Sequence, residues 1–430
     1  MTNNPIAAVE AAVDRLANDA TQLLADMIAF PSLAGYEDGV QKFVAAWLLD
    51  HGMPAEFVEA DPGLESDPNY SHHSLDGHHA PNVLTSLPSK KTGRSLLLNS
   101  HTDVVPAALP ELFQPEIADG KISGRGACDA KGQVVCWMLA MLAVKEAGIT
   151  LEGECIGAAV VEEEIGGNGT LALVRNMTRP FDVAVVLEPT VYAIHPANRG
   201  AIWFKIEVEG IPTHMGRWWE GQSAFENLEK VLAEVRKWDA EIVAESRGVP
   251  LFPDDPSPVH VNIGIVRSGD WPAKVPSAAT CEGGISFLPN KTLSQIKARM
   301  TQAVRRAAEM HGIKASVSFG KLQNEAYATP ADHPAVSSLR QAAIDVRGEA
   351  EVSGFLASCD ARLLFHRAKM PTIVFGPGDL GLAHSDIESI ELNEIVTAAK
   401  ILARFIIDWC GVSGSDSAGL ISKRPALPHG

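Results

Sequence analysis

The stretch that decides the fold is residues 157–170, GAAVVEEEIGGNGT. Small and branched apolar residues over 153–161 predict a buried strand, and a helical pattern follows at 170–177. Between the two stand three adjacent carboxylates at 162–164 and a glycine-rich turn. A buried strand that leads through a turn into a helix is the repeating unit of an α/β sheet.

Similar units lie on both sides of this stretch. Further buried strands are predicted at 95–105, 182–187 and 371–375, and helices at 6–29, 39–51, 130–147 and 392–409. Because strands and helices alternate, we expect a catalytic domain of the α/β class with a mixed, largely parallel sheet flanked by helices.

The middle of the chain has a different order, strand-helix-strand-strand-helix-strand, which is that of a ferredoxin-like α+β module. The strands are predicted at 201–209, 259–266, 279–288 and 315–320, and the helices at 221–244 and 293–311. We therefore expect an inserted domain at 199–323, within a discontinuous domain made of 1–198 and 324–430. The tail, 411–430, carries Gly, Ser and Pro without periodicity, and we assign it no role.

Composition excludes several classes of protein. The 430 residues are 46% hydrophobic, and 53 acidic against 36 basic side chains give a net charge of −17. Such a surface repels phosphate, so we expect neither nucleic acid nor an anionic membrane as partner. The sequence lacks an apolar run of about 18 residues, a secretory pattern at its start and CxxC spacing among its six cysteines. These features favour a cytoplasmic protein.

Metal-type ligands cluster where the predicted strands end. His101 and Asp103 are two residues apart, so on extended backbone they share a face. A carboxylate in that position can hold one ring N–H while the other nitrogen binds a metal. The alternative is a hydrogen-bonded pair at a strand end.

Asp129 stands in a glycine-rich turn, SGRGACDAKG (123–132), directly before a predicted helix. Asp is a common helix N-cap, which is the plainer interpretation. The other interpretation is a carboxylate that bridges two metal ions in a cleft.

The carboxylates at 162–164 admit two interpretations as well. Runs of charge are usually solvated, but this run ends a buried strand. A carboxylate beside a metal-bound water can act as a general base. Since adjacent side chains point in different directions, Glu164 could bind metal while Glu163 takes the proton. Glu188, at another strand end, and His384, in a late loop, are each weak signals alone.

Together these motifs resemble one family, the two-zinc amidohydrolases that include acetylornithine deacetylase, succinyl-diaminopimelate desuccinylase, aminoacylase and glutamate carboxypeptidase. The likeness spans about residues 20–410 and is greatest to acetylornithine-deacetylase-like deacylases. The matching motifs, in order, are His101-Thr-Asp103, GRGACDAKG, Glu163-Glu164, Glu188-Pro-Thr and His384.

The resemblance implies a metal set of two Zn²⁺ per subunit, with Co²⁺ or Mn²⁺ as possible substitutes. His101 and Glu188 would hold one ion, Glu164 and His384 the other, and Asp129 would bridge them.

It also implies roles beyond the ligands. Asp103 would orient the metal-binding histidine, and Glu163 would be the general base. A cis peptide bond is expected between Asp129 and Ala130.

For the inserted domain, the resemblance implies a lid and dimerisation module. His214 would reach the active site of the partner subunit and stabilise the oxyanion; without the resemblance it reads as a surface histidine. Trp218 and Trp219 follow it, and could line an acyl pocket or pack at the domain interface.

Three further positions concern the substrate. Ser286 stands where many relatives carry an arginine that clamps a carboxylate. Ser358 and Arg362 lie in a segment that resembles a substrate-facing motif, so Arg362 could replace the missing contact or form a structural ion pair.

The sequence thus predicts a metal-dependent, homodimeric hydrolase that removes an N-acyl group from a small, amino-acid-like amide. A dipeptidase or carboxypeptidase with the same site is the alternative, and a non-catalytic binding protein is a third. Four histidines at 72, 73, 78 and 79 stand in a polar loop, where we expect solvent exposure or a fortuitous nickel-binding patch.

Overall fold

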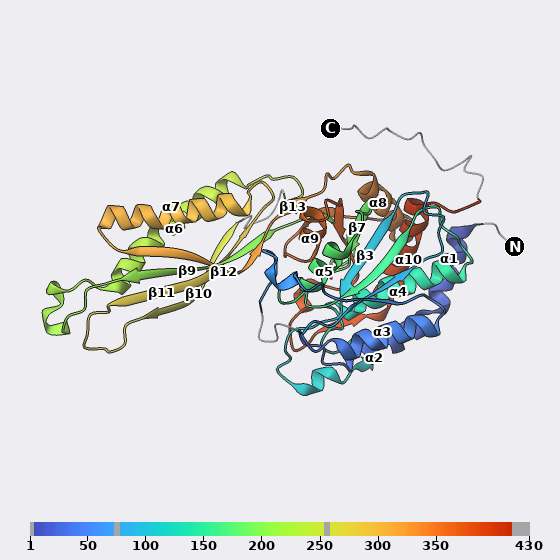
Figure 1. The fold of residues 1–430 in the computed structure, drawn as a ribbon, viewed down its shortest axis with the longest axis horizontal. Helices are drawn as coiled ribbons and strands as arrows, with labels where there is room; N and C mark the ends of the chain where they lie inside the picture. The colour runs from blue at the N-terminus through green and yellow to red at the C-terminus, as the bar shows by residue number, and fades with distance from the viewer. Residues whose placement is uncertain (1–3, 73–77, 253–258, 415–430) are drawn as a thin grey trace.

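The computed structural model describes residues 4–72, 78–252 and 259–414. The chain forms a large lobe, which contains both described ends, and an elongated smaller lobe built from residues 200–324 (Figure 1). His73 and residues 415–430 of the predicted tail lie outside the described residues.

The large lobe is organised by a nine-stranded sheet, in the order β1-β2-β6-β3-β7-β15-β8-β13 with β14 paired to β8. The bounds are β1 Glu56–Val58, β2 Asn82–Ser86, β3 Leu96–His101, β6 Cys155–Val160, β7 Val183–Val186, β8 Ile194–Asn198, β13 Tyr327–Ala328, β14 Val352–Phe355 and β15 Thr372–Val374. The centre is parallel, because β3 pairs in that sense with β6 and β7, and β15 with β7. The outer pairs are mostly antiparallel. The predicted mixed α/β class is confirmed.

Strand alternation explains the three layers. Along β3, Leu96 and Leu98 enter the core on one side of the sheet, and Leu97 enters the core on the other. The first side is covered by α1 Pro5–Arg15, α2 Ala17–Ile28, α3 Asp38–Asp50, α4 Lys131–Glu146, α8 Pro334–Arg347 and α10 Leu392–Cys410. The second side is covered by α5 Asn168–Asn176 and α9 Ala361–His366.

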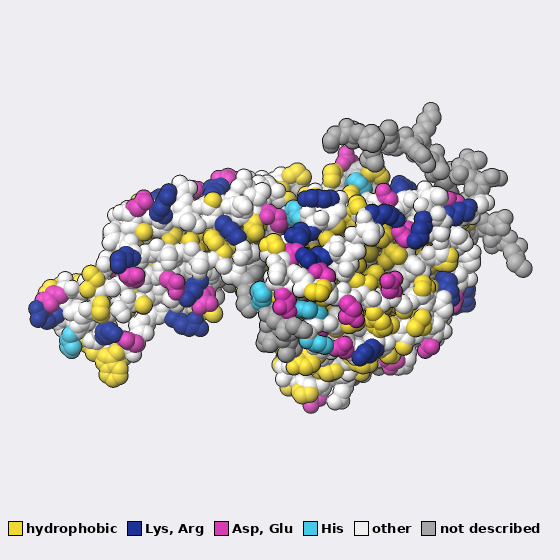
Figure 2. Space-filling view, viewed as in Figure 1, with side chains coloured by type: hydrophobic (Ala, Val, Ile, Leu, Met, Phe, Trp, Pro, Cys, Tyr) yellow, Lys and Arg dark blue, Asp and Glu magenta, His cyan; other side chains and the backbone are white. Residues whose placement is uncertain are grey.

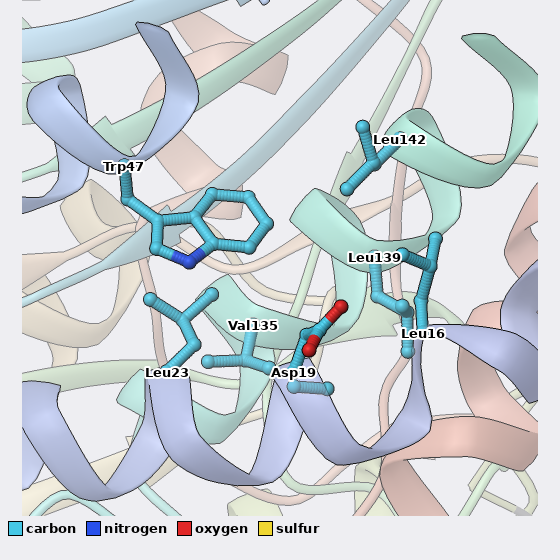
Figure 3. A pocket seen from close by; sticks show the side chains of 8 residues that line it. Leu16, Asp19, Leu23, Trp47, Val135, Leu139 and Leu142 are labelled. Atoms are coloured by element: carbon cyan, nitrogen blue, oxygen red, sulfur yellow. The ribbon is translucent and has the colours of Figure 1, made fainter. Parts of the chain in front are cut away.

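Helix α4 is buried along almost its whole length. It lies between β3 and β6 on one side and α1, α2 and α10 on the other, which suits a helix that is apolar all round. A small gap in this helical layer is lined by Leu16, Ala20, Leu23, Trp47, Val135, Leu139, Leu142 and one acid, Asp19 (Figure 3). With a single polar group, it is a packing gap rather than a site for chemistry.

A three-stranded sheet flanks the turn that carries Asp129. It joins β4 Glu116–Ala118, β5 Lys121–Ser123 and β16 Ser389–Glu391 in the order β16-β5-β4. β5 ends just before the glycine-rich turn.

The smaller lobe contains β9 Gly200–Glu209, α6 Ala224–Glu245, β10 His260–Ser268, β11 Ala278–Phe287, α7 Leu293–His311 and β12 Ala315–Asn324. Its sheet is antiparallel in the order β10-β11-β9-β12, as in a ferredoxin-like module. Alternate residues of β9, from Ile202 to Val208, pack under α6 and α7 in a core of their own.

Some elements were absent from the sequence-based prediction, notably β1, β2, β8, β14 and the two helices α8 and α9. These are short strands towards the edges of the sheet and helices of modest apolar content, for which periodicity is a weak signal. Among the described helices, none is both long and apolar enough to cross a bilayer.

Candidate metal centre

The candidate ligands meet at one edge of the large sheet. β3, β6, β7 and β15 are parallel neighbours, so their carboxyl ends lie at the same edge. His101 is the last residue of β3 and pairs with Val160 of β6; Glu163 and Glu164 follow that strand, and Glu188 follows β7. On the face seen in Figure 2, histidine and acidic side chains gather on the large lobe towards the smaller one.

Asp129 lies between two imidazoles. Its Oδ1 is 3.1 Å from His101 Nε2, and its Oδ2 is 3.2 Å from His384 Nε2. His384 Nε2 is also 3.0 Å from Glu164 Oε1. Ligand atoms of His101, Asp129 and Glu164 all lie within 4.8 Å of one another. One carboxylate oxygen faces each histidine, which is the arrangement that a bridging ligand requires.

The peptide bond between Asp129 and Ala130 is cis, as expected. Cys128, next to it, is fully buried, and its thiol donates to Asp379 O at 3.4 Å.

Asp103 organises two ligand segments at once. It is fully buried; its backbone oxygen is 3.0 Å and its Oδ1 3.4 Å from His101 Nδ1. The same carboxylate accepts the backbone N–H groups of Glu163 at 3.0 Å and Glu164 at 2.9 Å. With Nδ1–H of His101 directed at Asp103, the lone pair of Nε2 faces the cluster.

The centre concentrates negative charge away from water. Burial, and then the charge of Asp360, raises the pKa of Glu163. Burial also raises the pKa values of Glu188 and Glu164. For Glu188 the next cause is the negative charge of Asp129. Hydrogen bonds that His384 donates to the carboxylates of Asp129 and Glu164 raise its pKa to about 10.

The donor set fits divalent cations. Imidazole nitrogens and carboxylate oxygens are ligands of zinc in hydrolytic sites. Several buried carboxylates that repel one another are stabilised by positive charge among them.

One expectation about the 72–79 loop is wrong. The side chain of His79 is only 11% exposed, and its Nδ1 is 2.8 Å from Glu162 Oε1. Asn168 Nδ2 donates to the other oxygen of Glu162 at 2.7 Å, and Glu162 has a positive φ of 58°. His79 therefore packs on the turn that carries Glu163 and Glu164, because the fully buried carboxylate of Glu162 needs partners. His78 is exposed, as expected, and pairs with Asp38 at 2.9 Å.

The polar substrate candidates have different surroundings. Arg362 is buried, and its Nη2 donates to Gly166 O at 2.7 Å, so it braces the glycine-rich turn. The hydroxyl of Ser358 is buried and has no hydrogen-bond partner among the described residues. Ser286 Oγ accepts from Arg199 Nη1 at 3.4 Å.

Trp218 and Trp219 belong to the short 3-10 helix Met215–Glu220, which His214 caps, and this segment forms the end of the smaller lobe far from the large lobe (Figure 1). The two indoles are 66% and 64% exposed, with ring centroids 6.5 Å apart. His214 is also exposed, and its Nδ1 accepts the N–H of Gly216. Within one chain the structure does not bring these three residues to the metal centre.

Comparison with known proteins places the chain. The model of peptidase family M20/M25/M40 matches residues 97–408. N-formyl-4-amino-5-aminomethyl-2-methylpyrimidine deformylase of Bacillus subtilis is 26% identical over 87% of this chain and 89% of its own. A probable carboxypeptidase of Aspergillus niger is 27% identical over 87% of this chain and 86% of its own length.

Solved structures agree on the fold. Aminopeptidase PepT from Bacillus cereus superimposes with a TM-score of 0.72 at 20% identity, over 91% of this chain and 98% of that one. A dinuclear metal-binding peptidase from Bacillus subtilis superimposes with a TM-score of 0.64 at 15% identity, over 92% of this chain and 99% of that one. These matches define a hydrolase of the amidohydrolase and peptidase class. The chain belongs to peptidase family M20/M25/M40, which confirms the resemblance inferred from the sequence.

Proposed function

We propose that the protein is a two-zinc enzyme that removes an N-acyl group from a small amide. The observation that carries this proposal is the Asp129 carboxylate, which presents one oxygen to His101 and the other to His384. In the proposed assignment His101 and Glu188 hold one ion, and Glu164 and His384 hold the other. Zinc supplies a Lewis acid for the amide carbonyl and lowers the pKa of bound water.

The chain's own residues then manage orientation and protons. Asp103 fixes the ring of His101 and the backbone of the Glu163–Glu164 turn. Glu163 takes a proton from the attacking water and returns it to the leaving amine.

Two observations favour a deacylase over a peptidase. A peptide C-terminus requires a cation, but Ser286 occupies the place of the usual arginine, and Arg362 is engaged with Gly166. In addition, one of the relatives is a deformylase. The carboxypeptidase relative keeps peptide cleavage as the second candidate.

A test of this function combines metal content with a substrate panel. We expect about two zinc ions per chain and hydrolysis of N-formyl or N-acetyl amines and amino acids. A chelator should abolish cleavage, and added Zn²⁺, Co²⁺ or Mn²⁺ should restore it. Faster cleavage of dipeptides than of every N-acyl compound would select the peptidase, and chelator-resistant cleavage would exclude the metal mechanism.

We further propose a homodimer in a cytoplasmic setting, in which residues 199–323 act as lid and dimerisation domain. His214 lies on an exposed segment beside Trp218 and Trp219, so it is available to the partner's site. It would donate a hydrogen bond to the oxyanion, while the indoles would border the acyl group. The net charge of −17 argues against nucleic acid or an anionic membrane as a partner.

For His214→Ala we expect kcat to fall by about 10²–10³-fold with little change in KM, since the lost hydrogen bond belongs to the transition state. His311→Ala, at the end of α7, is the control and should leave kcat unchanged. Mixing His214→Ala with the inactive Glu163→Gln should restore activity, because a mixed dimer regains one complete site. An unchanged kcat, or no recovery on mixing, contradicts the trans role.

A further inference from the structure

We propose that Glu388 is a positioning residue that locks the Asp129 turn to the His384 loop and so sets the spacing of two metal ligands. This inference rests on the metal centre proposed above. Glu388 lies four residues after His384 and belongs to none of the motifs recognised in the sequence.

One oxygen of Glu388 holds the backbone of the Asp129 turn. Oε1 accepts three N–H groups, from Gly126 at 2.9 Å, Cys128 at 3.1 Å and Asp129 itself at 3.1 Å. The residue is only 1% exposed. Three buried donors that converge on one point need a strong acceptor, because a buried N–H group left without a partner loses its bond to water and gains none in return.

The other oxygen of Glu388 is connected through Arg125 to the loop that carries His384. Oε2 accepts from Arg125 Nη1 at 2.5 Å, and Arg125 Nη2 donates to His384 O at 3.5 Å. The backbone repeats the connection, because Gly124 N donates to Glu388 O at 3.0 Å and Ser123 pairs with Ser389. Side chain and backbone therefore join the same two segments.

The turn has little room to find another arrangement. Gly126 has a φ of +86°, and a Cβ there would lie 2.8 Å from Val104 and 2.9 Å from Lys131. Since the turn is packed this closely, losing its acceptor would shift Asp129 relative to His384 rather than let the turn adjust locally. Ligand positions must hold to within about 0.5 Å for tight binding.

These contacts also distinguish Glu388 from a ligand. Oε1 already accepts three N–H groups, more than the two acceptor positions of one oxygen, and Oε2 accepts from the cationic guanidinium of Arg125, which disfavours a metal ion beside it. Glu388 thus acts through Asp129 and His384. Outer partners of this kind typically contribute about 10–100-fold in metal affinity.

The test compares Glu388→Gln with Glu394→Gln. Glu394 is a matched control, a half-buried acid in the first turn of α10 that accepts one backbone N–H at 3.0 Å, from Gly378, which lies six residues before His384 and outside the Asp129 turn. Zinc affinity is measured by competition with a chromophoric chelator, on protein that circular dichroism shows to be folded. The visible absorption of the Co²⁺ form reports ligand geometry.

For Glu388→Gln we expect zinc to bind about 10–100-fold more weakly and the Co²⁺ spectrum to change. Glu394→Gln should match the wild type in both. Equal affinity and spectrum for Glu388→Gln and wild type, or equal losses in the two variants, would overturn the positioning role. If Glu388→Gln does not fold, Arg125→Lys decides: it keeps the charge but not the second donor, and wild-type affinity and spectrum in it would overturn the role.

The wild-type titration separates the two proposals. If wild-type protein binds no zinc, the proposed metal centre fails and the positioning role with it. If wild-type protein binds zinc and Glu388→Gln binds it equally well, only the positioning role fails.

Discussion

Replacing Glu163 with Gln is expected to lower kcat by about 10²–10⁴-fold while both metal ions stay bound. The amide is nearly the same size as the carboxylate but cannot take a proton from water. The turn itself should persist, because Asp103 holds the backbone N–H of this residue and not its side chain. KM should change little, since the lost contribution belongs to the chemical step.

Zinc content per chain and steady-state kinetics on the best substrate check this prediction together. Glu146→Gln, at the end of α4, is the control; the exposed carboxylate of Glu146 pairs with Arg15 at 3.6 Å, and the variant should retain wild-type kcat. Near-normal turnover in Glu163→Gln would remove it as the base. Loss of zinc with loss of turnover would instead make it a ligand.

Asp129→Asn is expected to have the largest effect on the metals. An asparagine keeps one acceptor oxygen but has an NH₂ group in place of the second. It therefore cannot offer a ligand oxygen on both sides, towards His101 at 3.1 Å and towards His384 at 3.2 Å. We expect zinc stoichiometry to fall from about two to one or none. The remaining affinity should drop by more than the ~100-fold typical of an outer partner.

Elemental analysis and chelator competition measure this loss. Asp386→Asn is the matched control, an exposed acid two residues after His384, and it should keep both ions. Two tightly held zinc ions in Asp129→Asn would show that the carboxylate does not bridge.

The sequence was informative wherever chemistry and secondary structure coincide. The parallel central strands could be predicted because they are buried on both faces and therefore read as continuous apolar runs. Their polar ends then indicated His101, Asp129 and Glu164, which the structure brings within 4.8 Å. The resemblance added His384, which no local pattern marks as a ligand.

The parts that sequence did not indicate depend on contacts between distant segments. Arg125 lies within a recognised motif and Glu388 outside all of them, but nothing in the sequence pairs the two, and only the folded chain joins them across 263 positions. His79 was expected in solvent because its loop is polar, but its partner Glu162 is buried at a strand end 83 residues away. Polar side chains that anchor loops do not recur at helical or strand spacing in the sequence. Their partners therefore could not be predicted from residue spacing.

The separate cores of the two lobes have a consequence for how this enzyme can diversify. The cluster under the smaller sheet is built almost entirely from that lobe, and none of the proposed metal ligands belongs to it. Mutations in this core can therefore accumulate without moving the proposed metal ligands, provided that His214 is kept. New substrates are most accessible to evolution, and to engineering, through the other residues of 200–324, while the metal ligands stay in the large lobe.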